Sequence, residues 1–481
     1  MGTQMPSAGG RKRPSARVRT ITALSLPLAA ALAVAACSSS SSSTSAASPA
    51  SSSAPAASSA PASAASSAAA SPASSSSAAG TGSYNPVTDY ASYIGGKSGA
   101  ANSSLSTIDI GVINQQGGSQ DIAPEWTDGA QIAADFINQD AGGIDGHPVK
   151  IVTCFIPDVV SNAAQCGQQM ANNSAVQAVS VGAVAVGNQA MESALAPTGK
   201  VLVFGVSVSP IDSTYKNGYI LFGDGTHVEA PLATFIKQYT SAKTVSLIYP
   251  NLPGSNVEAE ITEAALKYEG IPTKIVAFDP STTNLSGPLI ASGAASAGLL
   301  INDAPNPQLC SDVYKAIKQL NITTQVLANV PCDSAVAATG DGGSLPVGWY
   351  YASANPLPGD ASDPSLAAFA AVAGKFGKSS DASDAWVADS FAQLLTIAKW
   401  DDELLTSGKQ ITSANLNALA KTFKGPVPQG APTLVCGSFS AAPAVCNDEV
   451  SFFQNTSPGV FKAIARWIGP PNGFVIPASL Q

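Results

Sequence analysis

The segment Ile108-Asp109-Ile110-Gly111-Val112-Ile113 is a short apolar run, and the polar residues Asn114-Gln115-Gln116-Gly117-Gly118 follow it directly. A helical pattern comes next, with apolar side chains four residues apart at Ile132 and Phe136, and Gly142-Gly143 marks its end. A buried strand, a polar loop and an amphipathic helix, in this order, form the repeating unit of parallel α/β sheets. The sequence therefore indicates an α/β fold that begins with this unit.

The same alternation of apolar run and helix recurs along the chain. We expect further strands at residues 149–152, 176–181, 201–204, 219–222, 243–249, 272–278, 298–302, 325–329 and 347–353. We expect helices at residues 159–172, 188–197, 364–376, 383–405 and 412–422. About nine units are too many for one sheet of usual width, so we predict two lobes whose parallel sheets have helices on both faces. The remaining segment, residues 431–481, is short, has a β-like pattern and is rich in Pro and Gly.

The composition argues against several classes of protein. Of the 481 residues only 11% are charged, and 23 basic side chains stand against 32 acidic ones, a net charge of −9. Such an acidic chain is not expected to bind nucleic acid. The sequence holds two histidines, His147 and His227, and no Cys-x-x-Cys motif. We therefore expect no metal and no cofactor, and neither a zinc enzyme, a haem protein nor a histidine-based triad.

The N-terminus has the pattern of an export signal. Five basic side chains lie between Arg11 and Arg19, and an uncharged apolar run follows from Ile21 to Ala36. The run is too short to indicate a membrane span with certainty. It ends in Val34-Ala35-Ala36-Cys37, which resembles the lipobox of bacterial lipoproteins, whose cysteine is lipidated. We predict that residues 1–36 are a lipoprotein signal peptide; the alternative is an ordinary signal peptide.

Residues 38–79 contain only Ser, Ala, Pro and the single Thr44. These side chains are too small to build a core, so the segment is expected to remain solvated. We interpret residues 37–105 as a lipid-anchored, disordered tether, with the folded body beginning near Ser106. The expected location is the outer face of the bacterial cytoplasmic membrane.

Six further cysteines lie in the body, and an even number in an exported chain suggests disulfide bonds. They are Cys154, Cys166, Cys310, Cys332, Cys436 and Cys446. Pairing between neighbours in sequence, 154–166, 310–332 and 436–446, is the simplest arrangement. Free buried thiols are the alternative.

One segment carries a resemblance to a known family. The run from Glu125 to Ala130, and the turn Asn138-Gln139-Asp140-Ala141-Gly142-Gly143-Ile144-Asp145-Gly146, resemble the first helix and turn of the branched-chain amino-acid-binding proteins of ABC transporters. The resemblance extends over roughly residues 106–475. It implies the type I periplasmic-binding fold, in which two Rossmann-like α/β lobes are joined by three hinge crossovers and hold a ligand between them. Lobe 1 would be residues 106–224 and 348–437, and lobe 2 residues 225–347 and 438–481.

Ligands of parallel α/β sheets bind beyond the carboxyl ends of the strands. The loops that follow the expected strands are therefore candidates for ligand contact. They are residues 115–119, 184–188, 206–209, 226–227, 249–255, 302–306 and 330–331. Gln116 lies in the first of these loops.

The resemblance also implies positions for the groups that hold an amino acid in this family. The hydroxyls that bind its carboxylate would fall at Ala185 and Val208, and the acidic residue that binds its ammonium at Val330. A family tyrosine would fall at about Pro253. These residues lack the required polar groups, and a buried charge without a partner costs several kcal/mol. A shift of one residue in the alignment would place Ser207 or Ser209 at the position of Val208.

We therefore expect an amino-acid-like or less charged, partly apolar ligand. The candidate hydrogen-bonding side chains are Asn188, Ser207, Thr226, His227 and Asn302. His227 follows Thr226 where the chain would cross between lobes, and either contacts ligand or is an exposed residue at a helix start. The expected partners are the small-molecule ligand, a membrane permease and the lipid bilayer through Cys37, with the chain a monomer.

No catalytic motif accompanies this pattern. The sequence contains neither Gly-x-Ser-x-Gly nor His-Glu-x-x-His, and the pair Asp401-Asp402 is interpreted as solvated charge on a helix. A hydrolase is a minor alternative. A sensor that reports ligand to a membrane receptor, or a surface lipoprotein that has lost its ligand, would have the same sequence features.

Overall fold

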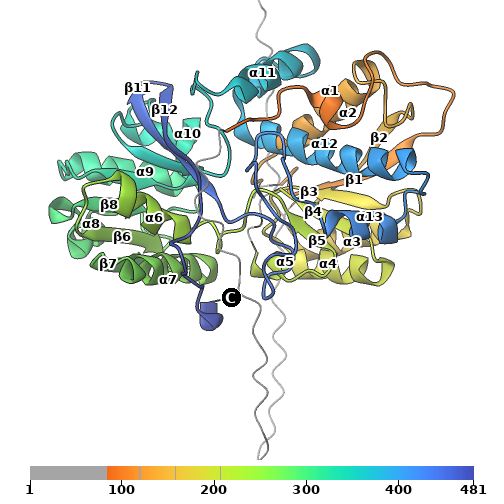
Figure 1. The fold of residues 1–481 in the computed structure, drawn as a ribbon. Helices are drawn as coiled ribbons and strands as arrows, with labels where there is room; N and C mark the ends of the chain where they lie inside the picture. Colours follow the sequence, from red (N-terminus) through yellow and green to blue (C-terminus); the bar gives the residue numbers. More distant parts are fainter. Residues whose placement is uncertain (1–83, 119–120, 158, 206, 208, 481) are drawn as a thin grey trace, which may run out of the picture. The chain divides into compact units, whose positions relative to one another are not determined.

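The computed structural model describes residues 84–118, 121–157, 159–205, 207 and 209–480, which all belong to one compact unit. The predicted signal peptide, Cys37 and the Ser/Ala/Pro-rich segment lie outside the described residues. The described residues form two β-sheets (Figure 1).

The first sheet is parallel throughout. It consists of β1 (Ile108–Asn114), β2 (Val149–Phe155), β3 (Ala178–Val181), β4 (Val201–Phe204) and β5 (Gly218–Ile220), in the order β2-β1-β3-β4-β5. The strand order changes direction between β1 and β3, which is the switch point of a doubly wound sheet.

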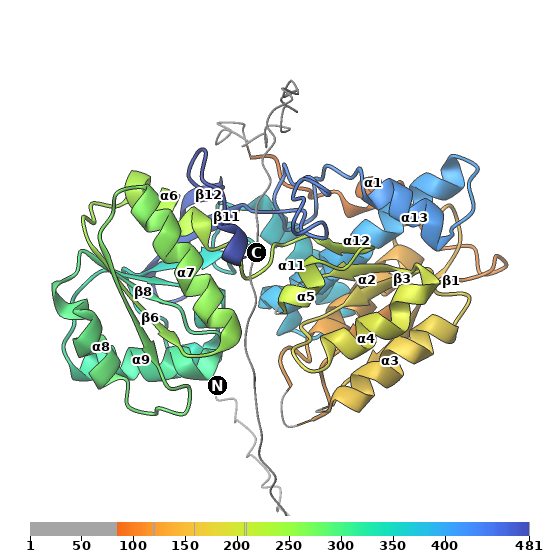
Figure 2. The same ribbon diagram turned by 90° about the horizontal axis from the view of Figure 1, so that it is seen from below.

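Helices cover both faces of this sheet (Figures 1 and 2). One face bears α2 (Trp126–Gln139), α12 (Ala385–Thr406) and α13 (Ser413–Ala420), and the other α3 (Val160–Asn172) and α4 (Asn188–Leu195). Successive strand residues alternate between the two cores, so Val201 and Val203 pack under α12 whereas Leu202 and Phe204 pack under α3 and α4. The helix α11 (Pro364–Phe376) packs against α2, and shorter elements nearby in the chain are η1 (Ala196–Thr198), α5 (Pro210–Ser213) and η5 (Asp381–Ser383).

A close approach of α2 to α12 depends on one glycine. A Cβ atom on Gly129 of α2 would lie 2.3 Å from the carbonyl oxygen of Val387 in α12, so the two helices can approach this closely only because residue 129 is glycine.

The helix α12 has an N-terminal cap. The side chain of Asp384, the residue before the helix, accepts a hydrogen bond from the N–H of Val387 at 3.1 Å.

The second sheet is mixed. It consists of β6 (Val245–Pro250), β7 (Thr273–Phe278), β8 (Leu299–Asn302), β9 (Val326–Ala328), β10 (Tyr350–Ser353), β11 (Val450–Ser457) and β12 (Val460–Ile468). The order is β12-β11-β10-β9-β8-β6-β7, and only the pairs β10–β11 and β11–β12 are antiparallel.

This sheet also lies between two apolar cores. One core is formed with α6 (Ala230–Tyr239) and α7 (Pro253–Tyr268), and the other with α8 (Ser286–Ser292), α9 (Pro307–Gln319) and α10 (Ala335–Ala338). Short turns of helix are η2 (Ala294–Ser296), η3 (Val330–Asp333), η4 (Thr339–Asp341) and η6 (Ala478–Leu480). The α/β fold class predicted from the sequence is confirmed.

The structure corrects two predicted boundaries. The strand expected at residues 347–353 is β10, which pairs with β9 and β11 in the second sheet, so lobe 1 cannot resume at residue 348 as predicted. An apolar run identifies a strand but not its sheet. The folded body also begins before Ser106, because the helix α1 (Tyr90–Tyr93) buries Tyr90, Tyr93 and the following Ile94 in the core beside α12.

The interpretation of Asp401-Asp402 as solvated charge is wrong. Both side chains are buried, with exposed fractions of 2% and 6%. Asp402 accepts a hydrogen bond from the N–H of Asp145, and burial raises the pKa of Asp401 to about 8. The cause is that α12 is covered on several sides by α2, α13 and the sheet.

The three predicted local disulfides are confirmed as Cys154–Cys166, Cys310–Cys332 and Cys436–Cys446. None of the helices in the described part of the chain has the length and apolar character needed to span a membrane.

Candidate functional site

A small pocket of about 20 Å³ lies beyond the carboxyl ends of three strands. It is lined by Ser207, Ser209, Pro210, Ser213, Asp224, Gly225, Thr226, Gly254, Val257 and Glu258. The first four residues follow β4, the next three follow β5, and the last three lie in the first turns of α7 after β6. The pocket therefore occupies the edge where parallel α/β sheets bind ligands.

Asp224 is the centre of a buried hydrogen-bond network. It accepts hydrogen bonds from the N–H of His227 at 2.7 Å, from Thr226 Oγ1 at 3.1 Å and from Ser213 Oγ. His227 Nδ1 lies 2.7 Å from Asp224 Oδ1. Asp224 is 3% exposed and His227 is 6% exposed.

The two side chains adjust each other's pKa. Burial by itself would raise the pKa of Asp224, but the charge and hydrogen bonds of His227 hold it below its usual value. Burial by itself would lower the pKa of His227, and the hydrogen bond and charge of Asp224 raise it above its usual value. Each side chain therefore favours the charged form of the other.

A second polar network lies behind Ser207. Asp212 accepts hydrogen bonds from Asn188 Nδ2 at 2.9 Å and from Ser207 Oγ at 3.1 Å. Burial raises the pKa of both Asp212 and the neighbouring Glu192, whose carboxyl group also interacts with Asp212. This network fixes the orientation of the Ser207 hydroxyl group.

Three further carboxyl groups lie on the side of the second sheet. Glu258 Oε1 is so close to Gly225 that a Cβ atom there would come within 2.1 Å of it. Glu229 accepts a hydrogen bond from Thr262 Oγ1 at 2.9 Å. Burial, followed by the charge of Asp303, raises the pKa of both Glu229 and Glu258.

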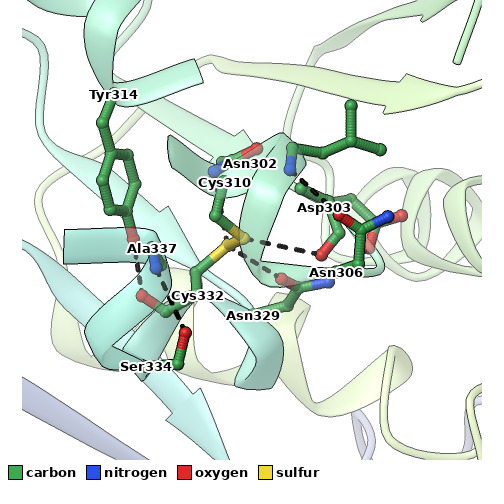
Figure 3. The surroundings of a disulfide bond; sticks show 11 residues. Asn302, Asp303, Asn306, Cys310, Tyr314, Asn329, Cys332, Ser334 and Ala337 are labelled. Atoms are coloured by element: carbon green, nitrogen blue, oxygen red, sulfur yellow. Dashed lines mark hydrogen bonds between the residues drawn. A yellow bond between two sulfur atoms is a disulfide. The ribbon is translucent and has the colours of Figure 1, made fainter. Parts of the chain in front are cut away.

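Asp303 directly follows β8 and is 2% exposed. Its Oδ1 accepts a hydrogen bond from Asn329 Nδ2 at 2.9 Å, while its Oδ2 has no hydrogen-bond partner among the described residues. Burial raises the pKa of Asp303. Figure 3 shows Asp303, Asn302 and Asn329 beside the disulfide Cys310–Cys332, which joins α9 to η3.

A separate acidic group lies around the first turn of α12. Burial and the charge of Asp384 raise the pKa of Asp333 to about 7. Burial raises the pKa of Asp389 as well, although Asn355 Nδ2 donates a hydrogen bond to it. None of these carboxylates has a described ion-pair partner.

The structure places some of the candidate residues at the pocket. Ser207 and Thr226 line it. Asn188 and His227 hold its walls through Asp212 and Asp224. His227 is not the exposed helix-start residue of the alternative interpretation, because its side chain is buried by Asp224 and by the ring of Phe439, 4.7 Å away.

Other candidates lie elsewhere. Gln116 Oε1 accepts hydrogen bonds from Asn114 and Thr127, and the N–H of Ala185 donates to Gln115 Oε1 at 2.8 Å. Asn302 Nδ2 lies 3.5 Å from Cys332 Sγ. Pro253 begins α7 beside the pocket, Val330 begins η3, and Val208 lies outside the described residues.

Sequence reasoning missed the carboxyl groups of this region. Asp303 lies in a loop predicted to contact ligand, but its acidic side chain received no role. Glu258 is three residues beyond another such loop, and the helical position of α7 that brings it to the pocket becomes visible only in the fold. The signal that could have found Asp303 is its place directly after a buried strand.

Two helix-covered sheets with polar groups at the carboxyl ends of their parallel strands define an α/β protein of the ligand-binding class. The family model described as periplasmic binding protein matches residues 107–433, and the chain belongs to that family. The fold is the type I periplasmic-binding-protein fold, as the resemblance implied.

Solved structures support the fold. The chain is similar to a leucine binding protein from Thermotoga maritima, with a TM-score of 0.59 and 18% identity, covering 76% of this chain and 100% of that one. For a fatty acid ABC transporter substrate-binding protein from Thermomonospora curvata the TM-score is 0.62 and the identity 14%, covering 80% and 98%.

A third similar structure is an ABC transporter solute binding protein from R. palustris in complex with 4-hydroxybenzoate, with a TM-score of 0.59 and 17% identity, covering 76% and 98%. No curated protein matches the chain by sequence. The ligands named for these proteins differ in chemistry, so the fold does not specify the ligand.

Proposed function

We propose that the chain is an extracytoplasmic substrate-binding lipoprotein of an ABC importer. In this function it captures a small molecule between two lobes by hinge closure and delivers it to a membrane permease. The observation that carries the proposal is the pocket, which residues after β4, β5 and β6 line at the expected edge, in a chain of the periplasmic binding protein family.

The proposed location follows from the N-terminus. Lipidation at Cys37 would anchor the chain to the outer face of the bacterial cytoplasmic membrane, and the Ser/Ala/Pro-rich segment would act as a tether. A tether keeps the binding protein near its permease at a high effective concentration. We propose a monomer without a cofactor and without a catalytic step, since capture and release suffice for this function.

The proposed contact region combines the candidate residues with those that the fold adds. Ser207 and Thr226 line the pocket, and Asp224 and Glu258 add two carboxyl groups to it. A pocket of about 20 Å³ has room for about one water molecule, so a larger ligand requires the walls to separate. Hinge motion of the two lobes would provide this opening, and closure would surround the ligand.

The test is a thermal-shift screen of the full chain in detergent against amino acids, amines, organic acids, sugars and aromatic acids. A ligand at 100 times its dissociation constant stabilises the folded state by about 2.7 kcal/mol, which a melting curve detects. We expect one chemical class to raise the melting temperature. A screen in which no compound does so at millimolar concentration would contradict the proposed function.

A further inference from the structure

The charged side chains around the pocket are almost all acidic. Asp224 and Glu258 line it, and no Lys or Arg occurs among its described lining residues. Glu229 bonds to Thr262, one turn beyond Glu258 on α7, and the N–H of Asp303 donates at 3.1 Å to the carbonyl oxygen of Ile248 in β6, the strand before α7. Of these four carboxyl groups, Asp224 has a basic partner in His227.

One buried carboxylate oxygen of Asp303, Oδ2, lacks a hydrogen-bond donor among the described residues. Asp303 Oδ1 is satisfied by Asn329, but Oδ2 is buried and has no hydrogen-bond partner among the described residues. A buried carboxylate oxygen without a donor is costly, and an ionised one is more so. A donor that also carries positive charge removes both costs.

Three of the four hydroxyl groups that line the pocket already donate to the protein's own carboxyl groups; the fourth is that of Ser209. Ser207 Oγ donates to Asp212, and Ser213 Oγ and Thr226 Oγ1 donate to Asp224. A ligand carboxylate would have to compete with these acids for the donors, and no Lys or Arg among the described lining residues would bind it. The site is therefore poorly suited to the carboxylate of an amino acid.

We propose that this site binds a small organic molecule with net positive charge, such as a diamine or a guanidinium compound, whose cationic groups contact Glu258 and Asp303. This inference rests on the proposed function and names the ligand class. It differs from amino-acid binding, because an amino acid with an apolar side chain carries no net charge. The pKa values of Glu258 and Asp303, raised by burial, fall when the cation binds.

The test uses compounds with the same chain length and different charge. Cadaverine is a dication, delta-aminovalerate a zwitterion, glutarate a dianion and pentanediol neutral; agmatine and choline add a guanidinium and a quaternary ammonium. Each is added to the full chain at near-neutral pH, and the melting temperature and the affinity by calorimetry are measured. We expect at least one of the three cations to raise the melting temperature, and the other three compounds to leave it unchanged.

Variants of Glu258 and Asp303 test whether the stabilising cation binds at this pocket. Glu258→Gln keeps the shape of the side chain and should weaken binding of the active cation roughly tenfold or more. Asp303→Asn should also weaken it. The matched control is Glu260→Gln, because Glu260 lies on the same helix but is exposed. Equal affinity of Glu258→Gln and Glu260→Gln would overturn the assignment.

The remaining outcomes separate this inference from the proposed function. Stronger stabilisation by aminovalerate or glutarate than by every cation would overturn the inference and leave the proposed function standing. The same holds if the cations have no effect while another compound of the wider screen binds. If no compound of either set stabilises the chain, both the inference and the proposed function fail.

Discussion

Asp224 holds together the segment that follows β5. Its carboxylate accepts hydrogen bonds from the backbone N–H and the Nδ1 atom of His227, and from the hydroxyl groups of Thr226 and Ser213. Ser213 precedes β5, whereas Thr226 and His227 follow it, so one side chain ties both ends of this strand. Such a position suits a residue that both shapes the pocket wall and stabilises the chain.

We predict that Asp224→Asn destabilises the folded state by about 3 kcal/mol, because a buried histidine loses its charged partner. The free energy of unfolding is measured by urea denaturation. The loss should be largest between about pH 4 and pH 6.5, where Asp224 is ionised and His227 is charged even in the unfolded chain. Above this range the contribution of His227 decreases as it loses its proton.

The control for this variant is Asp279→Asn, at an exposed carboxylate bonded locally to Ser281. It should leave the urea midpoint nearly unchanged. If Asp224→Asn unfolds at the same urea concentration as the control, the buried pair does not stabilise the fold.

At the level of elements, the disulfide Cys310–Cys332 links α9 to η3, and η3 follows directly on Asn329, the residue that donates to Asp303. The disulfide closes a loop of 22 residues, so its removal should cost about 3 kcal/mol. We predict that the double variant Cys310→Ala/Cys332→Ala also weakens ligand binding, because Asn329, which donates a hydrogen bond to Asp303, is no longer held in place by the disulfide.

The matched control is Cys154→Ala/Cys166→Ala, which opens a loop between β2 and α3 away from the pocket. It should lose similar stability by urea denaturation and keep its ligand affinity. Equal affinity of the two double variants would show that the 310–332 disulfide does not support the site.

The elements themselves could largely be predicted from the sequence. Strand β4 and helix α11 have the predicted bounds, because a short apolar run and a capped amphipathic segment are local signals. The sheet to which β10 belongs could not be predicted, since pairing is a long-range property. The burial of Asp401 was missed for the same reason: a helix pattern does not reveal how many elements cover it.

For the candidate site, the loops could be predicted from the sequence, but the carboxyl groups that they bring together could not. Ser207 and Thr226 come from loops after strands, as predicted. Glu258 and Asp303 are 45 positions apart in the sequence and belong to different β/α units, which only the pairing of β6 with β8 brings to one edge of the sheet. An overall acidic composition does not reveal where carboxyl groups cluster in the folded chain.

At the level of the whole molecule, several buried carboxyl groups have a raised pKa. Burial raises the pKa of Asp401 to about 8 and those of Asp333 and Glu449 to about 7. The folded chain therefore holds more protons than the unfolded chain above about pH 4, so stability falls as the pH rises through these values. His227, whose pKa is also raised, acts in the same direction.

We predict that the melting temperature of the ligand-free chain is higher at about pH 5 than at about pH 8, by roughly 5 °C or more. The measurement is a series of calorimetric melts at constant ionic strength. Replacing Asp401 by Asn should reduce the slope between these two values. A melting temperature that is constant or rises over this range would contradict the raised pKa values.

The central claim is that the chain captures a small molecule for import, and the most direct test is carried out on cells. The measurement follows, by mass spectrometry, which small molecules disappear from the medium of parent cells, of cells lacking this chain and of complemented cells. We predict that at least one compound, a net cation, remains in the medium only when the chain is absent. If all compounds disappear equally in the three cultures, the chain is not the binding protein of an importer, and a sensing role would take its place.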